Sequence, residues 1–368
     1  MIKKFAINIL LALSLLFPQI ATANVTIAVI APKAGTYKKQ GDELFSGAKL
    51  AIQEINDNGG LNGKKLDIIT IDDRCDDRLA ISTAQMLTLI NSKKIALVVG
   101  PYCSNKFDEI ANIYESAKIF QIVPTTVAYN TGDTDKKGQI MFLGTKSQMS
   151  DDFFQFYNQN FAGLKTAFIY DDNKENGYAD VAKSLFDKFK KHGKSDLLKF
   201  YTLNSDTNIQ DLNKALKKDN INISFVLSPK DIVTDFIEQL NNPNMILFTA
   251  KNMLSPSFDK AIEDKNNIIY LLALKGFKDS LMFTENLVDF RLHGIEPKGL
   301  ELYSYASIKL WNDLAQNTKD FNYDQLSQIA NSEELKEKWQ DFMMHTGSLK
   351  SSKYIIEMYN NGEFKQVY

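Results

Sequence analysis

Short apolar segments alternate with amphipathic helical segments in the first part of the chain. The run Ile95–Val99 is short, uninterrupted and rich in β-branched residues, which is typical of a strand buried on both faces of a parallel sheet. Glu43–Asn58 has apolar residues at helical spacing and stops at Gly59-Gly60. This alternation predicts a doubly wound parallel sheet with right-handed connections. The expected strands are Val25–Ala31, Lys65–Ile71, Ile95–Val99, Phe120–Val123 and Ile140–Leu143.

The same alternation restarts near Ser150 and predicts a second, similar α/β domain. Its expected strands are Thr166–Tyr170, Leu197–Leu203, Ser224–Leu227, Met245–Thr249 and Asn267–Leu274. Residues 280–344 are mostly helical in pattern, and two short β segments flank the turn Asn360-Asn361-Gly362 near the end. A chain of 368 residues is long enough for two domains of ordinary size.

Residues 1–23 have the pattern of a secretory signal peptide. Lys3 and Lys4 precede the apolar run Phe5–Phe17, and Ala21-Thr22-Ala23 is a small-residue cleavage site. An uncleaved membrane anchor, the alternative, needs a longer apolar run. We therefore expect a mature protein of residues 24–368 that is soluble in the periplasm. Its charge is close to neutral, with −2 for the whole chain, so no nucleic-acid partner is expected.

The two cysteines, Cys75 and Cys103, each follow a predicted strand. The carboxyl ends of parallel strands share one edge of a sheet, so the two side chains are expected near each other. An even count in an exported protein favours a disulfide. Two separate buried thiols are the alternative.

The sequence lacks the patterns that carry common enzyme chemistry. It contains no zinc, haem or phosphate-loop motif and no Gly-x-Ser-x-Gly elbow. The acidic pairs Asp72-Asp73 and Asp76-Asp77 lack the spacing of a calcium loop, which favours a polar strand-to-helix loop. We therefore expect no enzyme activity, no cofactor and no metal.

A helix is expected to begin directly after the stretch VVGPYCSN, residues 98–105. Gly100-Pro101 ends the preceding strand, and Ser104 is a natural N-cap for a helix over residues 105–117. A helix N-terminus at the carboxyl edge of an open α/β sheet can bind an anion. A plain helix cap is the alternative.

The segment 28–76 resembles the start of the leucine/isoleucine/valine-binding family. These are type I periplasmic binding proteins that serve ABC transporters. Residues 98–105 and 121–128 match the family's two ligand loops in the amino-terminal lobe, and the cysteine pair resembles the disulfide of that lobe. The likeness is strong to about Ala128 and weak after Ser280. The shared residues in the first segment are Gly41-Asp42, Phe45, Gly47-Ala48, Ile55-Asn56, Gly59-Gly60, Gly63, Leu66 and Asp72-Asp73.

The resemblance implies two doubly wound lobes joined by three crossover strands, in a hinged arrangement of the Venus-flytrap type. The crossings are expected near Gly144–Ser147, Ala273–Gly276 and His345–Leu349. The amino-terminal lobe would then comprise residues 24–145 and 275–347. The carboxy-terminal lobe would comprise residues 146–274 and 348–368.

The family likeness also implies a ligand site between the lobes. Ser104 and a backbone N–H at Val127 would bind the α-carboxylate of the ligand. Family tyrosines that shape the cleft correspond to Gln40, Asn176 and Asp231, and Tyr178 is close enough to take one such role. The full expected set is Gln40, Ser104, Asn105, Thr125, Thr126, Val127, Asn176, Tyr178, Asp231 and Lys251.

Two positions depart from the family pattern for an amino acid ligand. Val127 stands where relatives have a threonine hydroxyl, and Lys251 stands where they have an acidic partner for the ligand's ammonium group. One interpretation is that Lys251 faces the cleft and pairs with a second anionic group of the ligand. The other is that Lys251 points to solvent and Asp231 pairs with the ammonium.

These features together predict an exported solute-binding protein. It would capture a small amino acid or carboxylate in the cleft and act as a monomer with an ABC permease and ATPase at the inner membrane. The alternative is a soluble ligand sensor that feeds a chemoreceptor or signalling pathway.

Overall fold

The computed structural model describes residues 24–90, 95–104, 106–124, 137–142, 146–173, 178–251, 256–263, 265–276, 281–297, 299–318, 321–339, 354–360 and 362–368. The expected signal peptide, residues 1–23, lies outside these ranges. Within them, no helix has the length and apolar character that crossing a membrane requires.

The first lobe is built on a five-stranded parallel sheet with the order β2-β1-β3-β4-β5. Its helices α2 (Lys38–Asp57), α3 (Asp77–Leu89) and α4 (Phe107–Ser116) connect the first four strands. The strands are β1 (Val25–Ile30), β2 (Leu66–Ile71), β3 (Ile95–Val99), β4 (Phe120–Val123) and β5 (Gln139–Met141). The predicted parallel, doubly wound arrangement of this lobe is confirmed.

The second lobe has a seven-stranded sheet with the order β12-β11-β10-β9-β8-β6-β7. Strands β7 to β10 and β6 are parallel, whereas β11 and β12 add to the edge in antiparallel fashion. The strands are β6 (Thr166–Tyr170), β7 (Leu198–Thr202), β8 (Ile223–Leu227), β9 (Ile246–Ala250), β10 (Ile269–Leu274), β11 (Tyr354–Asn360) and β12 (Glu363–Gln366). The helices are α5 (Lys146–Asn160), α6 (Tyr178–Lys191), the 3₁₀ helix η2 (Ser195–Leu197), α7 (Ile209–Lys218), α8 (Lys230–Gln239) and α9 (Pro256–Glu263).

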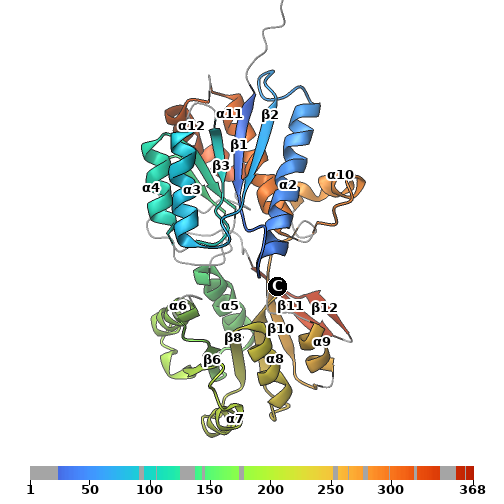
Figure 1. The fold of residues 1–368 in the computed structure, drawn as a ribbon. Coiled ribbons are helices and arrows are strands. Elements are labelled where there is room, and N and C mark those ends of the chain that lie inside the picture. The colour runs from blue at the N-terminus through green and yellow to red at the C-terminus, as the bar shows by residue number, and fades with distance from the viewer. Residues whose placement is uncertain are drawn as a thin grey trace, which may run out of the picture.

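After β10 the chain returns to the first lobe, as Figure 1 shows by the orange helices beside the blue ones. Helix α11 packs along α2 in the most extensive helix–helix contact of the described residues. The contact is close because Gly47 of α2 has no side chain, and a methyl group there would overlap the backbone of Glu301. The returning elements are the 3₁₀ helix η5 (Leu281–Asn286), α10 (Leu287–Leu292), α11 (Leu300–Gln316), α12 (Tyr323–Ala330) and α13 (Glu333–Lys338).

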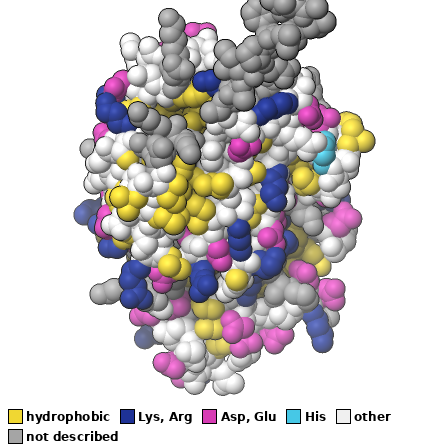
Figure 2. All heavy atoms as spheres, turned by 45° about the horizontal axis from the view of Figure 1, so that its top comes forward, with side chains coloured by type: hydrophobic (Ala, Val, Ile, Leu, Met, Phe, Trp, Pro, Cys, Tyr) yellow, Lys and Arg dark blue, Asp and Glu magenta, His cyan; other side chains and the backbone are white. Residues whose placement is uncertain are grey.

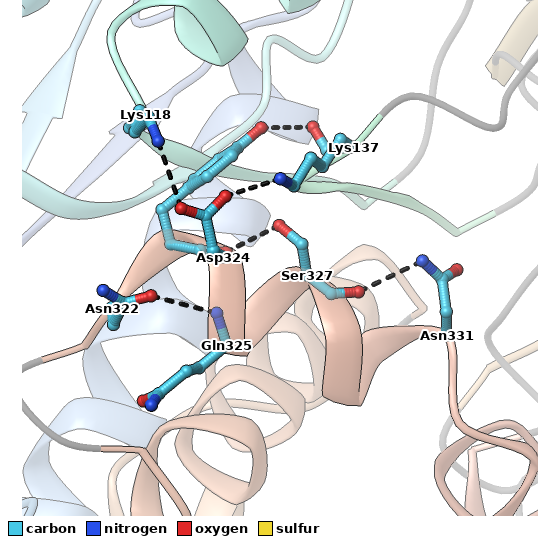
Figure 3. Close-up of polar contacts among 8 residues, drawn as sticks. Lys118, Lys137, Asn322, Asp324, Gln325, Ser327 and Asn331 are labelled. Atoms are coloured by element: carbon cyan, nitrogen blue, oxygen red, sulfur yellow. Dashed lines mark hydrogen bonds and ion pairs between the residues drawn. The ribbon is translucent and has the colours of Figure 1, made fainter.

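Helix α12 is fastened to the first sheet by polar contacts at the start of β4 and β5 (Figure 3). Asp324 accepts hydrogen bonds from Lys118 at 3.1 Å and from Lys137 at 2.5 Å. The hydroxyl of Tyr323 donates to the backbone carbonyl of Lys137. Gly138 lies directly against the Tyr323 ring. These contacts hold the returning chain on the lobe that began it.

Each lobe has its own apolar core. In the second lobe the core is rich in aromatic rings, with Phe153 stacked on Phe225 at 4.6 Å between centroids and edge-on to Phe248 at 5.1 Å. Leu274, at the end of β10, packs against this core and also against the core of the first lobe. The second expected crossing, Ala273–Gly276, is therefore at a point where both cores meet.

Several predicted boundaries differ from the structure. Helix α2 begins at Lys38 rather than Glu43, because Gly41 does not break it. Gly41 instead lets the helix lie against the backbone of Pro32, where a methyl group would overlap. Helix α9 was not predicted. The other two expected crossings, 144–147 and 345–349, lie partly or wholly outside the described residues.

Replacing Gly138 by alanine should destabilise the first lobe. Gly294→Ala is a matched control, because both glycines have φ of 72° but only Gly138 has a ring in the way of a methyl group. We expect the control to cost about 1 kcal/mol of unfolding free energy and Gly138→Ala to cost about 1–3 kcal/mol more. Urea denaturation measures both. Equal losses would mean that the Tyr323 contact adds nothing.

Candidate functional site

The candidate site lies between the two lobes, where strands of both sheets end and helices begin (Figure 1). In open α/β sheets, ligands bind outside the carboxyl ends of the strands. On the first lobe, Tyr37 follows β1 and Tyr102 follows β3. On the second lobe, Tyr178 opens α6 after β6, and Tyr354 opens β11.

Electrostatic interactions link these four tyrosines in pairs across the lobe boundary, Tyr178 with Tyr37 and Tyr354 with Tyr102. The rings of Tyr37 and Tyr102 meet edge to face, with centroids 6.2 Å apart. Burial raises the pKa of the Tyr178 phenol, and the nearby Tyr37 and Asp171 raise it further. Burial likewise raises the pKa of Tyr354 well above its ordinary value.

Tyr354 is also coupled to the first lobe, because Tyr303 and Tyr102 add to the rise of its pKa. Its backbone N–H donates to Asp152 at 2.8 Å, which anchors the start of β11 to α5. All these phenols stay neutral at physiological pH, so they offer hydroxyl donors and apolar ring faces. Side chains of this kind contact small organic molecules by ring packing and hydrogen bonding.

Ser104 is buried at the start of the α4 segment. Its hydroxyl donates to Asp77 at 2.9 Å and accepts the backbone N–H of Lys106 at 3.0 Å. The predicted role as N-cap is wrong, because α4 begins at Phe107 and its N-cap residue is Lys106. Ser104 instead stabilises the turn that leads into the helix. Its expected contact with a ligand carboxylate stays a prediction.

The structure contains the expected disulfide between Cys75 and Cys103, with Cα atoms 5.0 Å apart. It joins the loop after β2 to the loop after β3. Asp73 lies beside it, and its carboxylate together with the two sulfur atoms is the only cluster of possible metal ligands in the described part of the chain. Because both sulfur atoms are bonded to each other, this cluster is not available to a metal.

Gln40 and Asp231 lie on helices that start at the lobe boundary. Gln40 is in the first turn of α2, one helical turn after Tyr37, and its Oε1 atom is buried without a hydrogen-bond partner among the described residues. Asp231 is exposed in the first turn of α8. Both offer oxygen acceptors for a ligand donor.

Lys251 follows β9 and is paired within its own lobe. Its ammonium donates to both carboxylate oxygens of Glu357 on β11, at 2.7 and 2.9 Å. The Glu357 side chain is only 2% exposed, whereas that of Lys251 is 48% exposed. Neither interpretation of Lys251 from the sequence included this intramolecular pair, and which of them holds for a ligand stays a prediction. Glu357 is more than a hundred residues from Lys251 in the sequence, so local sequence patterns could not reveal the pair.

The remaining expected ligand residues lie outside the described residues: Asn105, Thr125, Thr126, Val127 and Asn176. Sequence reasoning missed Tyr37, Tyr102 and Tyr354. Tyr37 and Tyr102 each come a few residues after a predicted strand, a position that points to the site in this fold. No comparable sequence feature marks Tyr354 as a site residue. It reaches the site only after the chain has returned to the first lobe and crossed back to the second.

Asp73 should make the protein less stable as the pH rises. Its side chain is fully buried, and Oδ2 has no partner among the described residues. Burial, aided by Asp72 and Asp76, raises its pKa to about 6, above the value in the unfolded chain. The stabilising effect is therefore complete below the unfolded pKa and is lost as the pH rises through about 6, when the buried carboxylate ionises.

Asp73→Asn should remove this loss and raise the unfolding free energy at pH 8 by about 1–3 kcal/mol. Denaturant melts between pH 4 and pH 8 measure the effect. Asp72→Asn is the control, because hydrogen bonds from the backbone of Lys33 and Arg74 leave the pKa of Asp72 lowered despite its desolvation, so its effect has the opposite sign. An unchanged slope above pH 6 in Asp73→Asn would contradict the assignment.

Lys251→Met should destabilise the second lobe by about 3 kcal/mol, because it removes the ammonium from a buried carboxylate. The double variant Lys251→Met/Glu357→Leu should recover most of this loss, since an apolar pair replaces the ion pair. Urea denaturation of the wild type, both single variants and the double variant gives the coupling energy. A double variant as unstable as Lys251→Met would show that Glu357 is held by other contacts.

Comparison with known proteins identifies the family to which this fold belongs. The family model for periplasmic binding proteins matches residues 24–255. An amino acid binding protein of Pseudomonas aeruginosa is 25% identical over 300 residues, which is 78% of this chain and 77% of that protein. The Leu/Ile/Val-binding protein of Escherichia coli K12 is 27% identical over 218 residues, 58% of this chain and 57% of the relative.

A solved structure shows the same architecture over most of the chain. The ABC transporter substrate-binding protein of Desulfitobacterium hafniense, in complex with Leu, superimposes with a TM-score of 0.72 at 18% identity. The superposition covers 94% of this chain and 100% of that one. From the family match, the two-lobed α/β fold and the place of the candidate site, the chain belongs to the periplasmic binding protein family that includes the leucine/isoleucine/valine-binding proteins.

Proposed function

We propose that this protein is an exported solute-binding protein that captures a small amino acid or carboxylate between its lobes for an ABC importer. The observation that carries the proposal is that Tyr37 of the first lobe and Tyr178 of the second lobe are near enough to interact electrostatically. A ligand between them would contact both lobes at once, so binding would favour the closed arrangement of the lobes. The amino acid binding named for relatives supports the ligand class.

The carboxylate of the ligand is proposed to bind at the start of α4. Ser104 lies in the turn that leads into α4, and the backbone N–H groups at a helix N-terminus attract an anion. The bond to Asp77 holds the Ser104 side chain in place. The disulfide fixes the same loop one residue earlier, at Cys103. A site held in this way loses little conformational freedom when the ligand binds.

The ammonium of the ligand is proposed to bind near Asp231 and Gln40. The pairing of Lys251 with Glu357 supports this choice, because it compensates the charge that would otherwise repel an ammonium group. It also leaves Lys251 less free to attract a second anionic group. An amino acid with one carboxylate is therefore favoured over a dicarboxylate.

Export and the transport partners are part of the same proposal. The signal-like residues 1–23 and the disulfide fit a periplasmic location, where disulfides persist. A permease and an ATPase at the inner membrane would then receive the ligand. The lack of an assembled catalytic group in the sequence fits delivery of an unchanged solute.

The proposal is tested with mature protein, residues 24–368, by thermal shift against the amino acids and a set of dicarboxylates. A binder raises the melting temperature by mass action. Calorimetry of the best ligand should then show that Tyr178→Ala weakens binding at least about tenfold, as expected for a buried aromatic contact. Tyr359→Ala, at the far end of β11 beside Phe364, is the control and should bind normally. Equal affinity of Tyr178→Ala and wild type would place the ligand elsewhere, and no stabilisation by any amino acid would reject the ligand class.

A further inference from the structure

The outer face of α3 is apolar, although it lies on the surface. The inner face packs into the first lobe through Ala80, Ala84 and Leu87. The outer face exposes Leu79, Met86, Leu89 and the C-cap Ile90, and Leu89 is 85% exposed. No residue from Leu79 to Ile90 carries an ionisable side chain. A helix that faces water normally places charged residues on that side.

The neighbouring edge strand extends this surface. β2 ends the first sheet, and Ile71 packs against the core beneath α3. Alternate residues of a strand share a face, so Ile69 lies on the same side of the sheet, where it is 38% exposed. We call Ile69, Leu79, Met86, Leu89 and Ile90 the α3 patch. Figure 2 shows hydrophobic side chains gathered on this side of the upper lobe.

The spacing on α3 is that of a helix–helix seam. Leu79, Ser82, Met86 and Leu89 are exposed and follow one another at intervals of three, four and three residues. This is the repeat by which one helix packs along another. Clusters of exposed apolar residues of this kind mark an interaction site rather than a solvated face. The patch therefore fits a helical partner without charges on the contact face.

We propose that the α3 patch binds the α3 patch of a second copy of this chain, with the two helices antiparallel about a two-fold axis. Centred between Ser82 and Met86, this pairing sets Leu79 against Leu89 of the second copy. It also sets the small Ser82 against the large Met86, so that the side chains interdigitate. Two-fold contacts of this kind use the same surface on both copies.

The charge at the amino end of α3 also favours a second copy of the chain as the partner. Arg78 is exposed at the amino end of α3. In the antiparallel pair it lies beside Ile90 of the other copy, at the carboxyl end of that helix, where the helix dipole is negative. The residues of α3 between these ends carry no charge, so the facing helix needs no charged residue to compensate them. The self-complementary order of small, large and cationic residues along α3 is the reason for choosing a second copy over a different protein.

The contact is modest in size, so the dimer should dissociate on dilution. Helix α3 has 13 residues and is about 20 Å long. One helix pair with a flanking edge strand buries less than the roughly 800 Å² per partner of a standard stable interface. The inference therefore replaces the expected monomer by a reversible monomer–dimer equilibrium, and it does not depend on the proposed ligand.

Sedimentation equilibrium of the mature protein from about 1 µM to about 1 mM tests the proposal. Wild type should dimerise reversibly with concentration. Met86→Glu should weaken the dimer at least about tenfold, because it places two carboxylates in the seam. Leu292→Glu is the matched control: it adds the same charge at an apolar residue that is 77% exposed on α10, and it should dimerise like wild type.

Arg78→Glu supplies an independent test of the antiparallel orientation. It should also weaken the dimer, because a carboxylate would then face the negative end of the other helix. All variants change exposed side chains, and circular dichroism melts check that each is folded. Wild type that stays monomeric over the whole range would overturn the proposal. A dimer that Met86→Glu leaves intact, or that Leu292→Glu disrupts equally, would place the interface elsewhere.

Discussion

The packing of α11 along α2 is the contact on which the rest of the arrangement depends. It joins a segment near residue 300 to one near residue 50, and thereby returns the chain to its first lobe. Two small residues allow it, because Gly47 leaves room for the backbone carbonyl of Glu301 and the hydroxyl of Ser304. Tyr305 of α11 then donates to Glu54 of α2 at 2.5 Å, and Lys309 reaches the same oxygen at 3.3 Å.

This packing also positions one wall of the candidate site. The amino end of α2 carries Tyr37 and Gln40, and α11 carries Tyr303 beside Tyr354 of the second lobe. A shift of α11 would therefore move residues of the first lobe that line the lobe boundary. On the first lobe, the disulfide and the Ser104–Asp77 bond tie together the loops that follow β2 and β3.

Charge compensation decides how the second lobe can contribute to binding. A buried carboxylate such as Glu357 is stable in the fold only when a cation or hydrogen bonds compensate it. Lys251 supplies that cation, so its charge compensates Glu357 and is less available to a ligand. The Oε1 atom of Gln40 on the first lobe has no hydrogen-bond partner among the described residues, and Asp231 on the second lobe is exposed. Each lobe therefore offers an oxygen acceptor at the candidate site.

The local pattern of the sequence determined the strands, most of the helices and the disulfide, because apolar periodicity and turn residues act within a few positions of the chain. The family likeness added Ser104, Tyr178 and Asp231 as candidate ligand residues, and their contact with a ligand stays a prediction. Only the tertiary structure decided that Lys251 is paired with Glu357, that Tyr354 joins Tyr102 and Tyr303, and that the apolar stripe of α3 stays exposed. Those outcomes depend on segments about 50 to 250 residues apart, or on which side of a helix the core covers. Periodicity alone cannot tell a covered face from an exposed one, because burial is set by what the rest of the chain brings against it.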